Sequence, residues 1–574
     1  MKTTLKTTII TLFITRIVFG TTINIPDDYP YIQVGLYNAN SGDTVLVQPG
    51  TYYENISWPQ INGIRLISAG DTSNTIVDGS TTNGSVLSML PTTSTIIDAT
   101  TLIKGFKFTN GVPEQQGGGI RLYNASPTIN DVLLKGNSAP LYGGGLHAAA
   151  GSNPILENVT IIENSAYSGG GIYAEDSSPI LINVTIIDNS ADFGGGITLD
   201  ESSTILTNVM IINNQANEWG GGIYCSYSSS PVLTDVIISG NSSSHGGGIF
   251  FSYYSSISTI SNVIIKNNNV SDDGGGIFCD ENSSPVFTNM SVYGNSAYTG
   301  GGFYIDRSNP TLTNVVITSN SASYAGGIYI YGFGSSLDIS YSKITNNNAN
   351  VYGGGMEING ANANLTNVTI SNNMANYGGG GIYLSHPNTN VNMENSIMYY
   401  DSPDEIYISN GEFGAVYSDI QSGYDGNGNI DEDPMFCYPD TGNYYLDENS
   451  PCLGAGEYGV NIGAYGVGCY SSLGTHTSNL IPKNIVLHQN YPNPFNPTTT
   501  LRYDLPEDAK VSIMIFDLMG REVKTLVNSQ QNAGFKSIIW DATNNIGEPV
   551  SAGMYLYNIQ AGSYSKTMKM VLLK

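Results

Sequence analysis

Residues 168–197 read SGGGIYAEDSSPILINVTIIDNSADFGGGI, so that the phrase GGGI returns after 25 residues. Versions of this phrase recur from Gly117 to Gly379 at spacings of 25–28 residues, with AGG at Ala325 once in its place. An apolar residue follows every triplet. Self-similarity at this period predicts a solenoid, and the β-branched residues and missing heptads exclude a helical one.

Each repeat carries short β segments. After the triplet the order is apolar, variable, apolar, as in Ile172-Tyr173-Ala174, so the first and third side chains are expected inside the coil and the second outside. A second phrase follows, seen as PILENVTIIENSA at 154–166. About 25 residues with two or three short strands match one coil of a parallel β-helix, whose coils would lie about 4.8 Å apart.

These repeats resemble the right-handed parallel β-helix of the pectate-lyase-like superfamily, and GGGI with I-x-x-N-S-A is most similar to polymorphic outer-membrane and adhesin-type repeats. The resemblance covers residues 21–470. It implies an entry cap with a short helix over residues 31–40, within the stretch that ends TYYENI, and an exit cap at SPCLGAGEYGVNIGAYG. We therefore expect an all-β chain, a right-handed parallel β-helix followed by a small Ig-like β-sandwich.

Two asparagine columns repeat with the coils, and both are expected to point inward as ladders that satisfy buried backbone groups. The first column is Asn158, Asn183, Asn208, Asn262, Asn289, Asn314 and Asn367. The second is Asn137, Asn164, Asn189, Asn214, Asn241, Asn268, Asn295, Asn320, Asn347 and Asn373.

Charge and length divide the chain. A chain of 574 residues is too long for one ordinary globular core. Its net charge of −27 argues against nucleic acid as a partner. Residues 1–20, with Lys2, Lys6 and an apolar run, are typical of a signal peptide, and no later segment is apolar enough for a membrane span. Residues 21–474 hold eight Lys/Arg and forty Asp/Glu, whereas residues 475–574 hold nine and seven. This shift marks a domain boundary.

The C-terminal segment has its own character. After a polar linker at 471–483, strands of 5–8 residues separated by turns predict a β-sandwich over 484–574. NYPNPFNP at 490–497, FDLMGREV at 516–523, WDATNNIG at 540–547 and SAGMYLY at 551–557 closely resemble the type A sorting domain of type IX secretion substrates. That resemblance implies the type IX secretion machinery as a partner, and export to the extracellular space or the outer-membrane surface, with or without removal of the domain. The alternative is another Ig-like binding module.

The residue after each triplet and its apolar neighbour faces outward, and most members of this column are aromatic. Stacked aromatic rings on a solvated sheet suit the apolar faces of sugars, whereas the alternative is that they pair across strands to stabilise the coil. The candidate ligand-binding residues are Tyr173, Tyr224, Phe250, Phe278, Tyr304, Tyr329 and Tyr383.

Two pairs of acids lie on neighbouring coils two residues further on, Glu175 with Asp200 and Asp280 with Asp306. Carboxylates about 5 Å apart could serve a glycosidase, but surface coincidence is the alternative. Of the basic residues, only Arg121 and Arg307 come near this face. The five His are scattered, which argues against a catalytic zinc.

The segment DGNGNIDED at 425–433 alternates oxygen-bearing side chains as calcium ligands do, although it lacks the central Gly and terminal Glu of an EF-hand. Its candidate ligands are Asp425, Asn427, Asn429, Asp431 and Asp433. Calcium is the one cofactor that the sequence offers, and a turn-rich cap is the alternative.

Five cysteines fall into two groups. Cys225 and Cys279 share one inward position two coils apart, too far for a disulfide, and are expected as small core residues. Cys437, Cys452 and Cys469 cluster in the exit cap, where a disulfide is expected but the sequence does not choose the pair.

Together these features predict a secreted or cell-surface β-helix that acts as an adhesin-like or glycan-contacting scaffold, with surface or extracellular polysaccharide as its partner. A secreted carbohydrate-active enzyme, a polysaccharide lyase or glycoside hydrolase on the same fold, is the alternative. Fold alone does not separate the two.

Overall fold

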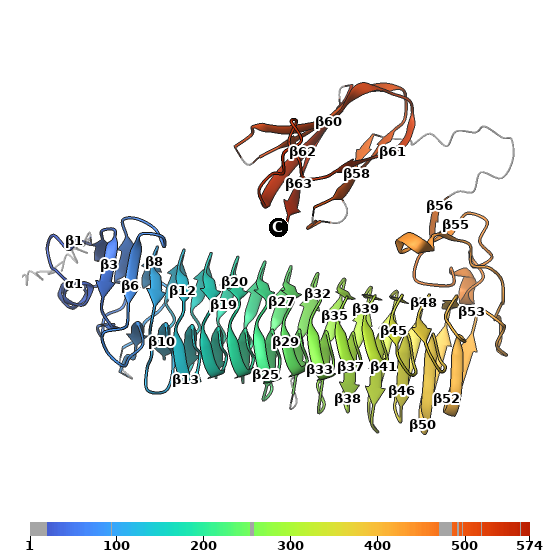
Figure 1. Cartoon of the computed structure of the whole chain (residues 1–574), viewed down its shortest axis with the longest axis horizontal. Coiled ribbons are helices and arrows are strands. Elements are labelled where there is room, and N and C mark those ends of the chain that lie inside the picture. The colour runs from blue at the N-terminus through green and yellow to red at the C-terminus, as the bar shows by residue number, and fades with distance from the viewer. Residues whose placement is uncertain are drawn as a thin grey trace, which may run out of the picture. The chain divides into compact units, whose positions relative to one another are not determined.

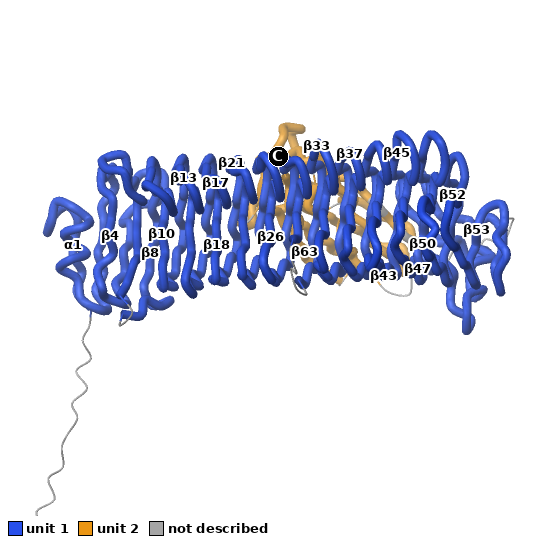
Figure 2. The backbone as a smooth tube through the Cα atoms, turned by 90° about the horizontal axis from the view of Figure 1, so that it is seen from below, with its two compact units in different colours: residues 1–471 blue, residues 472–574 orange. Residues whose placement is uncertain are grey.

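The computed structural model describes residues 20–573 except 93–94, 253–257, 470–484, 489, 491–492, 496, 518 and 563. The predicted signal peptide and linker lie outside the described residues, apart from Gly20. The chain forms two compact units, residues 1–471 and residues 472–574 (Figure 2).

A coil of the first unit contains four short strands (Figure 1). In one coil these are β18 (Ile172–Glu175), β19 (Ile180–Ile182), β20 (Thr185–Ile187) and β21 (Ser190–Phe193). The next coil repeats them as β22 (Ile197–Asp200), β23 (Ile205–Thr207), β24 (Met210–Ile212) and β25 (Gln215–Trp219). The sequence predicted two or three strands per coil. The additional strand is the one that ends just before the triplet, β21 or β25.

Equivalent strands of successive coils pair in parallel. Ile172 lies opposite Ile197, and Ile186 opposite Ile211. The third strands of the coils form a 15-stranded sheet from β3 (Gly50–Tyr53) to β53 (Asp419–Ile420). The fourth strands form a 10-stranded sheet from β13 (Ser138–Tyr142) to β49 (Met374–Ala375). The expected all-β fold with a right-handed parallel β-helix is confirmed.

The core runs along the inside of the coils. Ile172, Leu181 and Ile186 supply one coil's share, and all three are buried. Cys225 and Cys279 are fully buried in the same core, with Phe251 between them in register. Their expected role as small core residues is confirmed.

The second asparagine column is an inward ladder, as expected. All ten members are buried, and each amide except the last donates to the side-chain oxygen of the next member, as Asn214 Nδ2 does to Asn241 Oδ1 at 3.1 Å. The same Asn241 oxygen accepts the backbone N–H of Asn214 at 2.8 Å, and Asn214 Nδ2 also donates to the carbonyl of Ile186 at 3.0 Å. The ladder therefore satisfies backbone groups between coils.

The inward expectation is wrong for most of the first column. Asn158, Asn183 and the next four members are exposed, and they form an outward ladder, with Asn208 Nδ2 donating to Asn183 Oδ1 at 2.7 Å. Asn158 has φ of 55°, a left-handed conformation that Asn tolerates better than most residues. The chain turns at this residue, so strand alternation does not continue through it. Only Asn367 is buried, because the exit cap covers it and its amide donates to the carbonyl of Asn461 at 3.0 Å.

The entry cap contains α1 (Ile32–Asn38), which confirms the expected short helix. Ile32 and Leu36 are fully buried against the first coil. The Glu54 carboxylate accepts the backbone N–H groups of Ile32 at 2.8 Å and Gln33 at 2.9 Å. A side chain that is distant in the sequence thus accepts hydrogen bonds from N–H groups that have no partner within the helix.

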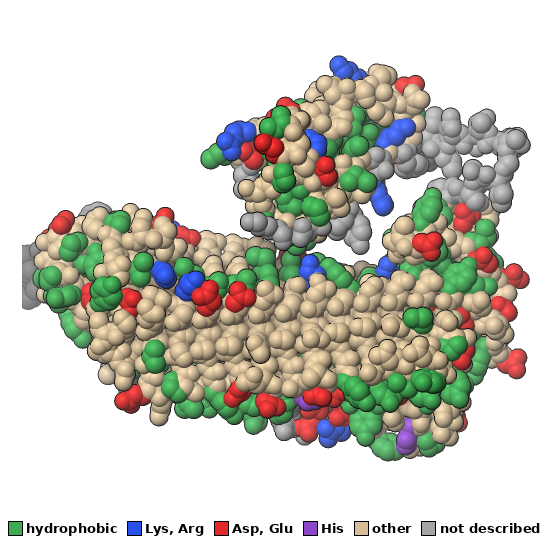
Figure 3. All heavy atoms as spheres, in the orientation of Figure 1, with side chains coloured by type: hydrophobic (Ala, Val, Ile, Leu, Met, Phe, Trp, Pro, Cys, Tyr) green, Lys and Arg blue, Asp and Glu red, His purple; other side chains and the backbone are tan. Residues whose placement is uncertain are grey.

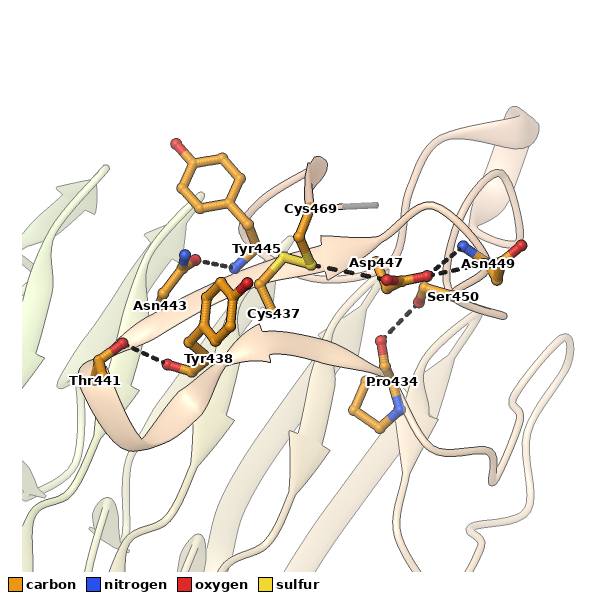
Figure 4. The surroundings of a disulfide bond; sticks show 10 residues. All are labelled: Pro434, Cys437, Tyr438, Thr441, Asn443, Tyr445, Asp447, Asn449, Ser450 and Cys469. Carbon is orange, nitrogen blue, oxygen red and sulfur yellow. Dashed lines mark hydrogen bonds between the residues drawn. A yellow bond between two sulfur atoms is a disulfide. The ribbon is translucent and has the colours of Figure 1, made fainter. Parts of the chain in front are cut away.

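The exit cap is a small sheet of β54 (Phe436–Tyr438), β55 (Asn443–Asp447) and β56 (Val467–Cys469). The Cys437–Cys469 disulfide joins its outer strands (Figure 4). Cys452 is free and buried, and its thiol donates to Asp419 Oδ2 at 3.0 Å. The pairing that the sequence left open is therefore Cys437 with Cys469.

The second unit is a β-sandwich. Its three-stranded sheet is β57 (Val486–Leu487), β58 (Thr499–Leu505) and β61 (Gly534–Trp540). Its four-stranded sheet is β59 (Ala509–Phe516), β60 (Glu522–Gln531), β62 (Gly553–Ala561) and β63 (Tyr564–Leu572). Both sheets bury side chains in one core, including Leu501, Ile513 and Trp540. Across the described part of the chain, no helix is both long and apolar enough to cross a membrane.

Candidate functional site

The predicted aromatic column lies outside the coil, but most of its rings are covered. Tyr173, Tyr224, Phe250 and Phe278 are each less than 10% exposed, Tyr383 is 9% exposed, and Tyr304 and Tyr329 are partly buried. Phe250 stacks on Phe278 with ring centroids 4.6 Å apart.

A second aromatic column from the strand before the triplet covers the first. Trp219 of β25 stacks on Phe250 at 5.4 Å, and Phe193 packs edge-on against Trp219 at 5.2 Å. Phe193 and Trp219 pack with Tyr224, Phe250 and Phe278 in a hydrophobic cluster separate from the main core. This contact pattern supports cross-strand packing for the middle of the column; a ligand-binding role for its seven members stays a prediction.

Exposed aromatic side chains also lie on this outer face. Tyr123 is 50% exposed, Tyr331 45%, Phe333 68% and Tyr407 42%. Figure 3 shows acidic, basic and hydrophobic side chains gathered along the lower edge of the first unit. An accessible ring surface therefore exists on the outer face. Tyr407 continues the predicted column, because it lies opposite Tyr383 in the paired strands, whereas Tyr123, Tyr331 and Phe333 lie outside that column.

The first predicted acid pair is adjacent. Glu175 and Asp200 lie opposite each other in the paired strands β18 and β22. The Tyr173 hydroxyl donates to Asp200 Oδ2 at 3.1 Å. Burial raises the pKa of Glu175, and the neighbouring Asp200 charge raises it further; burial also raises the pKa of Asp200. Both shifts favour the protonated form of a carboxyl group in this pair.

His147 and Arg121 extend this cluster, and the sequence reasoning did not join them to it. His147 is 1% exposed, and its Nε2 lies 3.9 Å from Glu175 Oε2. Among the described residues, neither His147 ring nitrogen has a hydrogen-bond partner, and burial lowers the pKa of His147 to about 4, aided by the Arg121 charge. The repeat spacing could have grouped these residues, because one position in successive coils is occupied by Arg121, His147, Tyr173 and Thr198.

The second predicted acid pair is bridged by an arginine. Arg307 Nη2 lies 3.3 Å from Asp280 Oδ1, 3.2 Å from Asp306 Oδ2 and 3.5 Å from Glu281 Oε1. Burial raises the pKa of Asp280 to about 6; the charges of Asp306 and Glu281 raise it further, and Arg307 opposes them. This cluster has the acids and the basic residue that the sequence named, in an exposed ion-pair network.

Four of the five predicted calcium ligands turn to separate partners. Asn429 Nδ2 donates to the carbonyls of Ala415 and Tyr424, both at 3.0 Å, and Asn427 Nδ2 donates to the Tyr417 hydroxyl at 2.8 Å. Asp431 Oδ1 accepts the Ser422 N–H at 3.2 Å, and Asp433 Oδ1 accepts the Tyr400 hydroxyl at 3.1 Å. Within the described ranges, no three His, Cys, Asp or Glu side chains are grouped as a metal set. Calcium stays a prediction.

Two hollows lie away from the acid pairs. A groove of about 1250 Å³ near the exit cap is lined by Asp425, Asn429 and Asp431 of the predicted calcium segment, together with residues of the last coils. A smaller one of about 420 Å³ lies near the entry cap and reaches Arg121.

Three family models match the chain. The right-handed beta helix region matches residues 53–243 and 207–365. The FlgD Ig-like domain matches residues 495–565, and the Chlamydia polymorphic membrane protein repeat matches residues 367–385. No curated protein matches the chain.

Solved structures show weaker likenesses. Dimeric latent PorU from Porphyromonas gingivalis is 24% identical over 16% of this chain and 9% of its own, with a TM-score of 0.14. PorZ, an essential surface component of the type IX secretion system of the same organism, is 22% identical over 17% of this chain and 12% of its own, with a TM-score of 0.12. The match thus spans about a tenth of either relative.

A third likeness covers more of the chain. The PL6 family alginate lyase AlyGC is 10% identical over 69% of this chain and 80% of its own, with a TM-score of 0.23. Identities and TM-scores this low carry no functional argument for any of the three structures. The two matches to the beta helix model, by contrast, together span residues 53–365, more than half of the 574 residues. This chain belongs to the right-handed beta helix region family.

Proposed function

We propose that this chain is an exported scaffold, extracellular or attached to the outer-membrane surface, that contacts neutral glycans. The observation that carries the proposal is the rim of the β-helix, where Tyr331 and Phe333 are exposed and Tyr331 lies opposite Asp306 in the paired strands. Aromatic faces suit the apolar faces of sugar rings, and carboxylates accept hydrogen bonds from sugar hydroxyls. The excess of acids over bases in residues 21–474 disfavours anionic polysaccharides.

Export would run through the type IX secretion machinery. The support is the set of motifs over residues 484–574 and their β-sandwich fold. Deleting residues 484–574 should leave the protein in the periplasm of a type IX secreting host, measured by fractionation and immunoblotting. Release of the truncated protein at the normal level would remove this part of the proposal.

The binding role is tested on the full chain with a glycan array of neutral and anionic oligosaccharides. Tyr331→Ala combined with Phe333→Ala should weaken binding of a neutral hit at least tenfold. Tyr37→Ala is the matched control, because Tyr37 is 62% exposed but lies in the entry-cap helix. Equal binding by all three proteins would locate the contact elsewhere, and absence of any neutral hit would overturn the role.

A second candidate function is hydrolysis of a neutral glycan, and the cluster at Glu175 and Asp200 favours it. A retaining glycosidase needs two carboxyl groups about 5–5.5 Å apart, one protonated and one charged. Adjacent coils place the pair at about this strand spacing. The raised pKa of Glu175 suits the acid, and Asp200 would be the nucleophile.

Release of reducing sugar from neutral polysaccharides separates the two functions. Hydrolysis that disappears in Asp200→Asn and in Glu175→Gln, but persists in Asp188→Asn on the same coil, would replace the scaffold with an enzyme. Asp188 is a fair control because it is exposed and has φ of 54°, which Asn also tolerates. Binding without any release of reducing sugar would exclude this second candidate.

A further inference from the structure

The groove of about 1250 Å³ lies at the C-terminal end of the β-helix. Its floor comes from β47 (Asn362–Thr366), β50 (Ile382–Glu394) and β52 (Ile406–Val416), and its wall comes from residues 422–431. β50 and β52 are the last long strands of the solenoid (Figure 1). Neither acid pair lies in it, so the groove is separate from the sites discussed above.

An outward column of amides runs across the floor and stops at a glycine. Asn364, Asn392 and Gly414 lie opposite one another in three paired strands. Asn392 Nδ2 donates to Asn364 Oδ1 at 3.1 Å, and Asn364 Nδ2 donates to Asp338 Oδ1 at 2.8 Å. Gly414 supplies no side chain, so the column ends in open space.

The backbone does not require glycine at position 414. A Cβ there would meet no atom nearer than 4.0 Å, and its φ is not positive. By contrast, a Cβ on corner Gly196 would lie 2.6 Å from the carbonyl oxygen of Gly222. The corner glycines are needed for packing. Gly414 instead leaves room above the floor, and the nearest side-chain atom to that room is Asn392 Oδ1.

The wall is held in place by side chains that close the end of the sheet. The Tyr424 hydroxyl donates to the Phe413 carbonyl at 2.7 Å, and Asn429 Nδ2 donates to the Ala415 carbonyl at 3.0 Å. The Tyr424 ring also packs edge-on against Phe413 at 5.0 Å. These contacts satisfy backbone groups on the last strand, which would otherwise be a free edge. They also fix the wall in advance of any ligand, which lowers the cost of binding.

The lining mixes apolar and polar side chains, and among the described residues it contains acids but no basic side chain. Glu394, Asp425 and Asp431 contribute carboxylates, and Asn364 and Asn392 contribute amides. Carboxylates accept hydrogen bonds from hydroxyls, and amides both donate and accept them. An anionic ligand would be repelled, because no described Lys, Arg or His lines the groove. The set therefore suits a neutral, hydroxyl-rich molecule.

We propose that this groove binds a neutral oligosaccharide, with a sugar ring above Gly414 and its hydroxyls bonded to Asn392, Asp425 and Asp431. The proposal rests on the proposed function, and it adds a defined site and ligand class. The volume exceeds the 300–1000 Å³ that usually holds a small molecule, so the groove has room for several sugar units.

The test uses isothermal titration calorimetry on the full chain. The probes are cellopentaose, xylopentaose and mannopentaose as neutral ligands, pentagalacturonate as the anionic ligand, and Ca²⁺ alone. At least one neutral probe should bind, and pentagalacturonate should not. Gly414→Trp should raise the Kd at least tenfold because its ring fills the open floor, whereas Gly414→Ala should change it less than threefold.

Two further variants keep the test independent of folding. Asn392→Ala should also raise the Kd at least tenfold. Glu412→Gln, an exposed change on the strand of Gly414 but outside the groove lining, should have no effect. Far-UV circular dichroism and the melting temperature check that all variants fold. Neutral binding that neither Gly414→Trp nor Asn392→Ala weakens would overturn this site and leave the proposed function standing. No neutral binding by the unaltered chain would overturn both. Binding of pentagalacturonate, or of Ca²⁺ alone, that Gly414→Trp abolishes would overturn the ligand class.

Discussion

Truncating the inward asparagine ladder at one position tests how the β-helix is held together. The Asn214 side chain donates to the carbonyl of Ile186 at 3.0 Å and to Asn241 Oδ1 at 3.1 Å. Its oxygen accepts the backbone N–H of Asn189 at 3.0 Å and the Asn189 amide at 2.9 Å. Asn214→Ala therefore leaves the Asn189 N–H and the Ile186 carbonyl buried without these partners. Each orphaned group costs about 1–3 kcal/mol, so we expect a loss of about 2–6 kcal/mol in the free energy of unfolding.

Asn217→Ala is the matched control, because it removes the same side chain three residues away in the same coil. Asn217 is exposed, and its amide makes one side-chain contact, with Asp192 Oδ1 at 2.5 Å. This control should cost less than about 0.5 kcal/mol. Urea denaturation of the full chain, followed by circular dichroism and by the fluorescence of nearby Trp219, measures both. If the two variants lost equal stability, the ladder would not carry buried backbone bonds and the reasoning would be wrong.

Three other predictions concern a buried carboxyl group, the disulfide and a turn residue. Burial raises the pKa of Glu357 from 4.5 to about 8, so its contribution to stability is full below about pH 4.5 and is lost as the pH rises to about 8. The melting temperature of Glu357→Gln should therefore fall less than that of the unaltered protein over this range, and parallel curves would contradict the assignment. Replacing both Cys437 and Cys469 by Ser removes a disulfide between residues 32 positions apart. We expect a loss of about 3 kcal/mol in the free energy of unfolding, seen as faster proteolysis in the exit cap. The unaltered protein, denatured without reductant, should show only the three thiols of Cys225, Cys279 and Cys452. Ala325 holds φ of 54° where other coils have glycine, so Ala325→Gly should stabilise by about 1 kcal/mol, and a lowered melting temperature would show that its methyl packing outweighs the strain.

The period of the repeat was enough to predict the coil, its stacking and the inward apolar residues, because every coil must bury the same positions against its neighbours. It failed at the first asparagine column. Asn158 and its equivalents occupy a left-handed turn between two strands, and the inside–outside alternation restarts there. Leu156 and Val159 are both buried, and a strict two-residue period cannot place both inside.

The positions of the candidate residues in the coil were predictable from the sequence, but their burial was not. Tyr224 and Phe250 were correctly placed outside the coil, but their burial depends on Phe193 and Trp219, which stand before the triplet. Those two residues reach the column only because of the shape of the glycine corner. The cluster of Arg121, His147 and Glu175 was likewise hidden, since its members come from three coils.

The glycine triplet itself explains where a ligand can reach this molecule. Gly169 has φ of 66°, which turns the chain so that the strands on both sides of the corner present side chains to each other. Cβ atoms on Gly170 and Gly171 would each lie 2.6 Å from a carbonyl oxygen of the next coil, so the corner cannot carry larger residues. The concave corner is therefore filled by the aromatic side chains that flank it, and the middle of that face is packed. Among the described residues, open surface lies along the rim that carries Tyr331, at the last coils beside Gly414 and in the smaller hollow near the entry cap. The first two are the surfaces at which the proposed binding would take place.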